Sequence, residues 1–531
     1  MMKRVFYGVF SIGLTAILIT VILKPQNNLI PARMFIYMLV WVLILCGIRW
    51  GIGRVESFLR SRHVDLGRFS RRALLLYVVL YGILLYVVSL ILRSYPVTDY
   101  GSVYETAYQL AVGETVEDWQ YFGMWTNNLG PLTILTFCMK LGIFLGFSDP
   151  YYLVLAMNVL QVTLVLVCIF YLMGKLGSGG AAAQWFAVAV YSLWTPIWAC
   201  TNAFYSDQLS FGGSIMAITL LIYGCGVQGF RRWGAIMGAG LIWGVSIAAK
   251  ATSAIALVAL IFTLIMVRAA RIWKELLTFG VVMVLTVGSL SAVSDSYPSK
   301  AEEYRLKFPT EYWIALGLMG DGTYGANLDF IEECYLSPNA DSRRELCIQK
   351  IREHWGNLFQ GEHLADKASV NFGDGSISPT SHIYPYRESL LWHWVYWDGD
   401  YFWKYACLST GFFYAVLLLM LVGAAMRALG YGNSPKVETA GKRACAANDI
   451  NNGSLAAYDD RGMRANLTFM IYLTVFGAFL FLMLWEAQNK QLYNQIPWIT
   501  LAAVCGLESV GECVTIGLYS RQEKAGMPPA P

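Results

Sequence analysis

The stretch "ALLLYVVLYGILLYVVSLILRSYPVTDYGSVYETA", residues 73–107, joins a membrane-length apolar run to a short acidic segment. Residues 73–92 carry no charge, and about 20 helical residues are enough to span the roughly 30 Å hydrocarbon core of a bilayer. Asp99 and Glu105 follow the run closely. The stretch therefore predicts a helix that crosses a membrane and then presents carboxylates near the lipid headgroups.

The rest of the chain is equally apolar. Of its 531 residues, 56% are hydrophobic and 14% are charged, and the mean hydropathy is +0.49. This composition predicts an all-α polytopic membrane protein with about 12 transmembrane helices. The first span has no small-residue cleavage site after it, so we interpret it as a retained anchor. The predicted spans are 5–23, 34–48, 73–92, 151–173, 181–199, 206–223, 233–249, 251–267, 276–293, 406–426, 465–485 and 498–518.

Basic residues predict the orientation of these spans. The connection 49–72 contains seven arginines, which places it in the cytoplasm by the positive-inside rule. The apolar segment 131–147 is short and carries Lys140; if it crossed the membrane, the later basic loops would all lie outside. We therefore expect 131–147 to be a re-entrant or interfacial helix on the outer face. Both termini are then cytoplasmic, and the location is the plasma membrane.

The predicted spans divide the chain into four regions. Residues 1–72 form two N-terminal helices and the basic loop, and 73–293 form a transmembrane module that includes the outer loop 93–150. Residues 294–405 are long enough for a mixed outer domain. Residues 406–531 hold the C-terminal helices and a polar cytoplasmic loop, 429–464, which we expect to be flexible.

Two cysteines, Cys334 and Cys347, lie in the predicted outer domain. An oxidising compartment permits a disulfide between them. Their spacing does not fix the geometry that the bond requires. Both states of the pair remain open at this point.

Three charged residues share one predicted depth, at the outer surface of the membrane. Asp99 follows the span 73–92, Asp207 begins the span 206–223, and Lys250 joins two further spans. Asp207 and Lys250 each have a structural alternative, since Asp207 suits the N-cap of the helix that it opens and a lysine at a junction can extend toward the headgroups. Together they suit chemistry on a lipid phosphate, with a cation for the phosphate and an acid as general base.

The order of several segments resembles the amino-terminal half of the type-C glycosyltransferases, which share the GT-C fold. The nearest group is that of the protein O-mannosyltransferases and the lipid A aminoarabinose transferases. The resemblance covers about 73–293, and a weaker one includes "WEAQNKQLYNQIPWI" at 485–499, where Leu492 stands at the position expected for an arginine. The segments are "TDYGSVYETAYQLAVG", "NNLGPLTILTFCMKLGIFLGFSD", "YLMGKLGSGGAAAQWFAVAVYSLWTP", "NAFYSDQLS" and "GVSIAAKATSAIAL".

The resemblance implies roles for particular residues. It makes Asp99 the general base and Lys250 a ligand of the lipid phosphate, with Asp207 beside the substrate. It also implies Glu486 and Tyr493, in the late stretch, as substrate-binding residues. Beside these we expect Tyr100, Glu105, Asn127 and Asn128 to take part in substrate binding, although Tyr100 and the two asparagines depart from the family pattern.

The implied reaction moves a monosaccharide from a polyprenyl-phosphate carrier to a hydroxyl group of an extracytoplasmic acceptor, with inversion. The acceptor class stays open between a cell-wall polymer, a lipid and a protein. The sequence offers no clear ligand set for a metal, so we expect no cofactor, and we expect no nucleic-acid partner. The alternative is a polytopic transporter or flippase of a lipid-linked intermediate, which would place its polar site near the bilayer midplane and show paired halves.

Overall fold

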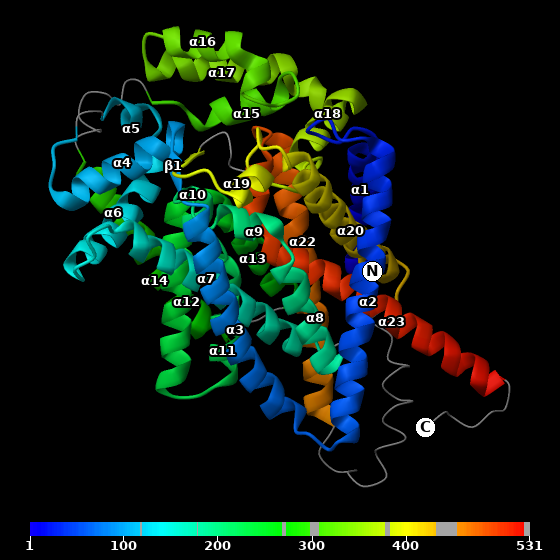
Figure 1. Ribbon diagram of the computed structural model, residues 1–531. Coiled ribbons are helices and arrows are strands. Elements are labelled where there is room, and N and C mark those ends of the chain that lie inside the picture. Colours follow the sequence, from blue (N-terminus) through cyan, green and yellow to red (C-terminus); the bar gives the residue numbers. More distant parts are fainter. Residues whose placement is uncertain are drawn as a thin grey trace.

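The computed structural model describes residues 1–116, 119–177, 179–267, 272–297, 307–377, 383–431 and 454–524, with only the backbone described for 454–461, 512 and 514–524. Most of the predicted flexible loop, 432–453, therefore lies outside the described residues. The described chain is a bundle of long helices that carries a layer of short helices at one end (Figure 1). We call this end the upper end, as it is drawn in Figure 1.

Nine helical stretches of the described residues are long and apolar enough to cross a membrane. Each overlaps one of the predicted spans, so nine of the predicted spans are confirmed as apolar helices. They are α1 (Met2–Leu23), α2 (Pro31–Ser61), α3 (Leu66–Ile91), α7 (Tyr151–Leu176), α10 (Ser206–Leu209) with α11 (Gly213–Gly226), α12 (Phe230–Ala249), α14 (Trp273–Asp295), α20 (Phe402–Ala428) and, within α22 (Ser454–Leu484), the stretch Gly462–Leu484.

The three remaining predicted spans differ from simple membrane-length helices. Segment 251–267 is a short apolar helix made of η2 (Ala251–Ala254) and α13 (Ile255–Val267). Segment 181–199 is divided into α8 (Gly180–Ser192) and α9 (Thr195–Cys200), because Pro196 lacks the N–H that a continuing helix requires and sits in the first turn of α9. Segment 498–518 belongs to α23 (Ile496–Lys524), and most side chains of its last third lie outside the described part of the chain.

The segment predicted not to cross, 131–147, forms α6 (Leu129–Phe144), which is not among the nine membrane-length stretches. It packs against α4 (Thr98–Val112) near the upper end of the bundle (Figure 1). Its start meets the end of α12 at Gly130, where an added Cβ atom would lie 1.9 Å from the backbone oxygen of Ala248. Only glycine permits this approach, and the contact lies two residues before Lys250.

The upper layer is helical in its described residues and contains one short strand. Its first helices, over residues 310–354, surround a small core that includes Phe308, Tyr312 and Phe330. Phe372 and Trp392, from its later helices, pack in the core of the bundle. Cys334 and Cys347 are buried in this core, where the structure has them as free thiols in side-chain contact. The elements are α15 (Thr310–Leu318), η6 (Gly325–Asn327), α16 (Leu328–Leu336), α17 (Ala340–His354), η7 (Trp355–Phe359), α18 (Gly361–Phe372), β2 (Ile383–Pro385) and α19 (Leu390–Val395).

A two-stranded antiparallel pairing ties the upper layer to the bundle. Strand β1 (Ser94–Pro96) pairs with β2, with Tyr95 opposite Tyr384. Because β1 immediately precedes α4, this pairing fixes the point at which the chain leaves α3 and enters the segment that holds Asp99.

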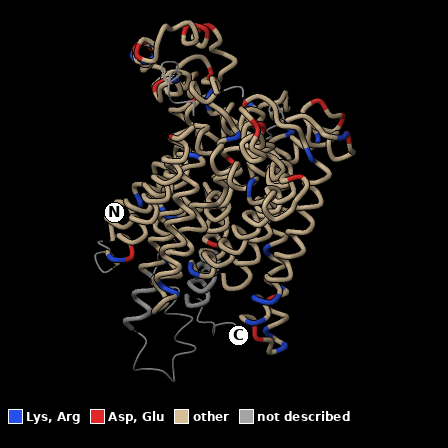
Figure 2. The backbone as a smooth tube through the Cα atoms, turned by 90° about the vertical axis from the view of Figure 1, so that its left-hand side faces the viewer, with Lys and Arg blue, Asp and Glu red and all other residues tan. Residues whose placement is uncertain are grey.

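Charge collects at the two ends of the bundle, and the middle is mostly free of it (Figure 2). The arginine-rich connection between α2 and α3 lies at the lower end, opposite the upper layer (Figure 1). The basic connection 49–72 and the acidic segment after residue 92 therefore lie at opposite ends of α3, as the sequence predicts.

Candidate active site

Asp99 lies in the first turn of α4, directly after a strained residue. Thr98 has a positive φ of 54°, which is uncommon for a β-branched residue and clusters at functional sites. The Asp99 side chain is half-buried, and the hydroxyl of Tyr121 donates a hydrogen bond of 2.9 Å to its Oδ1 atom. The carboxylate is thus held in place and remains accessible.

A chain of hydrogen bonds supports Tyr121 from behind. Asn128 Nδ2 donates to the Tyr121 hydroxyl at 2.6 Å, and the Tyr205 hydroxyl donates to Asn128 Oδ1 at 2.8 Å. The ring of Tyr205 stacks on Tyr100 with centroids 4.2 Å apart. Burial raises the pKa of Tyr121 and of Tyr205 well above the usual value, so both remain protonated donors. Two predicted residues, Tyr100 and Asn128, therefore belong to the support of Asp99.

Asp207 and Lys250 form an ion pair at the same end of the bundle. Asp207 is 1% exposed in the short helix α10, and Lys250 Nζ donates a hydrogen bond to its Oδ1 atom. The other oxygen, Oδ2, has no hydrogen-bond partner among the described residues. Asp207 makes no N-cap bond, and the lysine is paired with this buried carboxylate.

The segment after α22 adds a third carboxylate and a second cation. Glu486 is 4% exposed, and Gln488 Nε2 donates to its Oε1 atom at 2.6 Å. Burial raises the pKa of Glu486 to about 7, an effect that Lys490 opposes and Asp99 strengthens.

Lys490 lies with its Nζ atom 5.8 Å from the ring centroid of Tyr100. Burial lowers the pKa of Lys490, and Glu486, Asp207 and Asp99 counteract that effect. Four distant segments thus place five charged groups in one neighbourhood, which we call the charged cluster: Asp99, Asp207, Lys250, Glu486 and Lys490.

The Glu486 pKa makes stability depend on pH. The folded protein holds this proton up to a pKa of about 7, whereas the ordinary value is 4.5, so the folded state binds more protons between the two values. We expect the melting temperature in detergent to fall as pH rises through this window, and the Glu486→Gln variant to lose this component of the fall. Gln keeps an acceptor for Gln488. Glu114→Gln, at an exposed position, serves as the control. Parallel pH profiles for parent and Glu486→Gln would contradict the assignment.

Three residues predicted for the site lie outside the charged cluster. Glu105 is exposed on α4, and no described contact joins it to the group. Asn127 is exposed and reaches the site only through a 3.3 Å hydrogen bond to Asn128. Tyr493 is buried against Phe211, with ring centroids 4.7 Å apart, and hydrogen-bonds to the Thr201 side chain.

The sequence interpretation missed Lys490, Tyr121 and Tyr205. A signal existed for Lys490, which stands two residues before Leu492, where the family resemblance led us to look for an arginine. The tyrosines carried no such signal, because their role depends on Asn128 reaching both of them.

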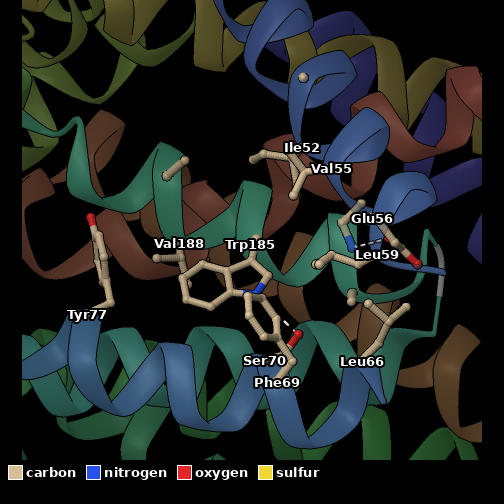
Figure 3. Close-up of a pocket in the computed structure, with 14 residues that line it drawn as sticks. Ile52, Val55, Glu56, Leu59, Leu66, Phe69, Ser70, Tyr77, Trp185 and Val188 are labelled. Carbon is tan, nitrogen blue, oxygen red and sulfur yellow. Dashed lines mark hydrogen bonds between the residues drawn. The ribbon is translucent and has the colours of Figure 1, made fainter. Parts of the chain in front are cut away.

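A pocket of about 440 Å³ lies away from these residues, between α2, α3 and α8 (Figure 3). Its lining is almost wholly apolar and includes Leu59, Phe69 and Trp185. Its one carboxylate, Glu56, is engaged by Arg60 at 2.6 Å and by the N–H of Ala182 at 2.7 Å. The pocket suits hydrocarbon and offers no unengaged carboxylate for catalysis.

Among the described residues, no group of three or more histidine, cysteine, aspartate or glutamate side chains is arranged to hold a metal ion.

No protein-family model and no curated protein matches the chain. Among solved structures, ArnT from Cupriavidus metallidurans bound to undecaprenyl phosphate is 14% identical, with a TM-score of 0.34, and the match covers 82% of this chain and 77% of ArnT. The apo form of ArnT is 15% identical, with a TM-score of 0.32, and the match covers 83% of this chain and 78% of ArnT. The archaeal oligosaccharyltransferase AglB from Archaeoglobus fulgidus, in complex with an inhibitory peptide and a dolichol-phosphate, is 11% identical, over 86% of this chain and 52% of its own, with a TM-score of 0.38. Both are GT-C enzymes, the class that the sequence resembles.

Proposed function

We propose that the chain is an integral-membrane glycosyltransferase that moves a monosaccharide from a polyprenyl-phosphate carrier to a hydroxyl group of an acceptor, with inversion. The observation that supports this best is the charged cluster at the upper end of an apolar bundle. Asp99 is accessible there, and the two ammonium groups of Lys250 and Lys490 lie close enough to affect the pKa of Glu486. A carrier lipid would bring its phosphate to this depth while its chain stays in the hydrocarbon.

In the proposed transfer step, Asp99, Asp207, Lys250 and Lys490 have different roles. Asp99 takes the proton of the acceptor hydroxyl as its oxygen attacks the anomeric carbon. The bond between that carbon and the phosphate oxygen breaks, and polyprenyl phosphate leaves with the electron pair. Lys250 and Lys490 neutralise the charge that builds up on the leaving phosphate, an effect of several kcal/mol when the donors are already in position. Asp207 acts as a positioning residue, since its buried carboxylate orients Lys250.

The proposed orientation follows from charge. The connection between α2 and α3 lies at the lower end, and most of the seven arginines of 49–72 lie in it or in the adjoining helix ends. The positive-inside rule assigns this end to the cytoplasm. The upper end, with the charged cluster, then faces outward across the plasma membrane, and both termini are cytoplasmic. A transporter would instead hold its polar site near the bilayer midplane.

The direct test is purified protein in detergent, supplied with polyprenyl-phosphate sugars. We expect release of polyprenyl phosphate, by transfer to an added acceptor or, more slowly, by hydrolysis. A protein that leaves every such donor intact, and instead moves a lipid-linked sugar across a liposome membrane, would refute the transferase and support the flippase.

Lys490 offers a test of the phosphate site at a residue that the sequence interpretation missed. A hydrogen bond to a charged group contributes about 1.5–3 kcal/mol, so Lys490→Ala should weaken donor binding about 10- to 100-fold. Lys490→Arg should recover part of the loss, because it keeps a cation with different geometry. The matched control is Lys24→Ala, which removes an exposed lysine whose ion-pair partner is Asp366. Equal donor affinity in Lys490→Ala and the parent would remove Lys490 from the site.

A further inference from the structure

A polar cleft of about 320 Å³ opens beside the charged cluster. Three segments far apart in the sequence form it: the α1–α2 connection, the loop before η6 in the upper layer, and the chain between α22 and η9 (Asn489–Gln495), together with two residues near the end of α18. The lining residues are Gln26, Asn27, Thr323, Tyr324, Gly325, Val370, Asp374, Ala487, Gln488, Asn489 and Lys490.

A buried carboxylate organises the wall of this cleft. Asp374 is 7% exposed and accepts hydrogen bonds of 2.8 Å from the N–H and the hydroxyl of Ser376. It also accepts bonds from the side chains of Asn489, at 3.1 Å, and of Asn27. Burial raises the pKa of Asp374 and these bonds oppose that effect. The carboxylate therefore holds two carboxamides, from two different lining segments, in fixed positions.

The cleft is continuous with the site of the proposed reaction. Lys490 lines it and also belongs to the charged cluster. Tyr324, which is 41% exposed, lies on the cleft wall. Burial raises the pKa of Tyr324, and Asp99 and Glu486 are near enough to raise it further. A ligand in the cleft would thus end next to the proposed general base.

The lining chemistry selects a class of ligand. Its side chains include four carboxamides and two hydroxyls, groups that both donate and accept hydrogen bonds, as sugar hydroxyls do. Charge is balanced between one carboxylate and one ammonium group, so an anionic ligand would find only one cation in the lining. Val370 and Ala487 are its only aliphatic side chains, so a lipid chain would bury little surface.

We propose that this cleft binds the acceptor and that the acceptor is a neutral glycan. The proposal rests on the proposed transferase function, and it names the acceptor class that the reaction leaves open. A glycan seated along the carboxamides would present one hydroxyl to Asp99, and its remaining hydroxyls would replace the water that hydrates the cleft.

Two neighbouring asparagines provide a matched test. Asn27 and Asn28 both have left-handed backbone angles, φ 56° and 55°, and both are exposed, but only Asn27 lines the cleft. Glycine tolerates this conformation. Asn27→Gly and Asn28→Gly therefore each remove a side-chain carboxamide without straining the backbone. Binding of neutral tetrasaccharides (mannotetraose, cellotetraose and chitotetraose) to the full-length protein in detergent is measured by saturation-transfer NMR, without donor.

We expect at least one tetrasaccharide to bind the parent, and Asn27→Gly to weaken that binding about two- to tenfold, the effect of one hydrogen bond. Tyr324→Ala should weaken it as well, and Asn28→Gly should leave it unchanged. The proposal is overturned if no tetrasaccharide binds, if Asn27→Gly and Asn28→Gly act alike, or if Asn27→Gly instead weakens a phosphorylated sugar or a peptide. Because the measurement uses no donor, it can fail while the release of polyprenyl phosphate succeeds, and the reverse also holds.

Discussion

We expect the replacement of Asp99 by asparagine to lower turnover by about 10²- to 10⁴-fold, the usual contribution of a general base. Asparagine has nearly the same shape and keeps an acceptor for the 2.9 Å hydrogen bond from Tyr121, but it cannot take the proton of the acceptor hydroxyl. Donor binding, expression and the melting temperature should change little. The measurement is transfer from a polyprenyl-phosphate sugar at matched protein levels, with donor affinity determined separately.

Glu105→Gln is the matched control, because it neutralises an exposed carboxylate on the same helix. A base acts through one atom in one place, so only the Asp99 variant should lose turnover. If both neutralisations act alike, the acidic segment works through its general field. If Asp99→Asn keeps turnover within a few-fold of the parent, Asp99 is not the base, and Glu486 becomes the next candidate.

The contrast between Asp99 and Glu105 shows which part of the candidate site could be predicted from the sequence. At 100° per residue, six positions along a helix rotate a side chain by about 240°, so the two carboxylates cannot share one face of α4. The helical period therefore predicts that Glu105 lies away from Asp99 once the segment is known to be helical.

Other features of the site depend on tertiary packing that the sequence pattern does not show. Asp207 and Lys250 were expected at the same depth, and the approach of α11 to α12 brings them into contact. An added Cβ at Gly213 would lie 2.4 Å from the Cβ of Ser246. That proximity joins residues from different helices, and no local pattern encodes it. The position of Lys490 depends in the same way on η9, whose 3₁₀ turn differs from the α-helical spacing.

The membrane-spanning helices were more predictable, because hydrocarbon requires long apolar helices. The break between α8 and α9 also had a signal, Pro196, which the apolar composition of 181–199 outweighed. The upper layer is different. Its short helices are specified by a small core of their own and by contacts with the bundle, such as Gly317 against the backbone of Leu484 and Trp485.

Variants of the Asp207–Lys250 pair can distinguish a structural role of the pair from a role in binding phosphate. Lys250→Met leaves Asp207, which is 1% exposed, without its cation, and Asp207→Asn leaves the lysine without its carboxylate. Breaking a buried pair from one side costs about 3–5 kcal/mol. We expect each single variant to lose unfolding free energy of this order, measured by denaturant titration in detergent, and each to lose activity.

The double variant, Asp207→Asn with Lys250→Met, decides between the roles. Replacing both members of a buried pair is often neutral for stability, so the double variant should regain most of the stability that the single variants lose. If Lys250 binds the phosphate, the double variant folds but neither binds donor nor turns over, because methionine offers no charge. Recovery of both stability and transfer in the double variant would show that the pair only holds α10 against the end of α12, and would leave Lys490 as the cation of the phosphate site.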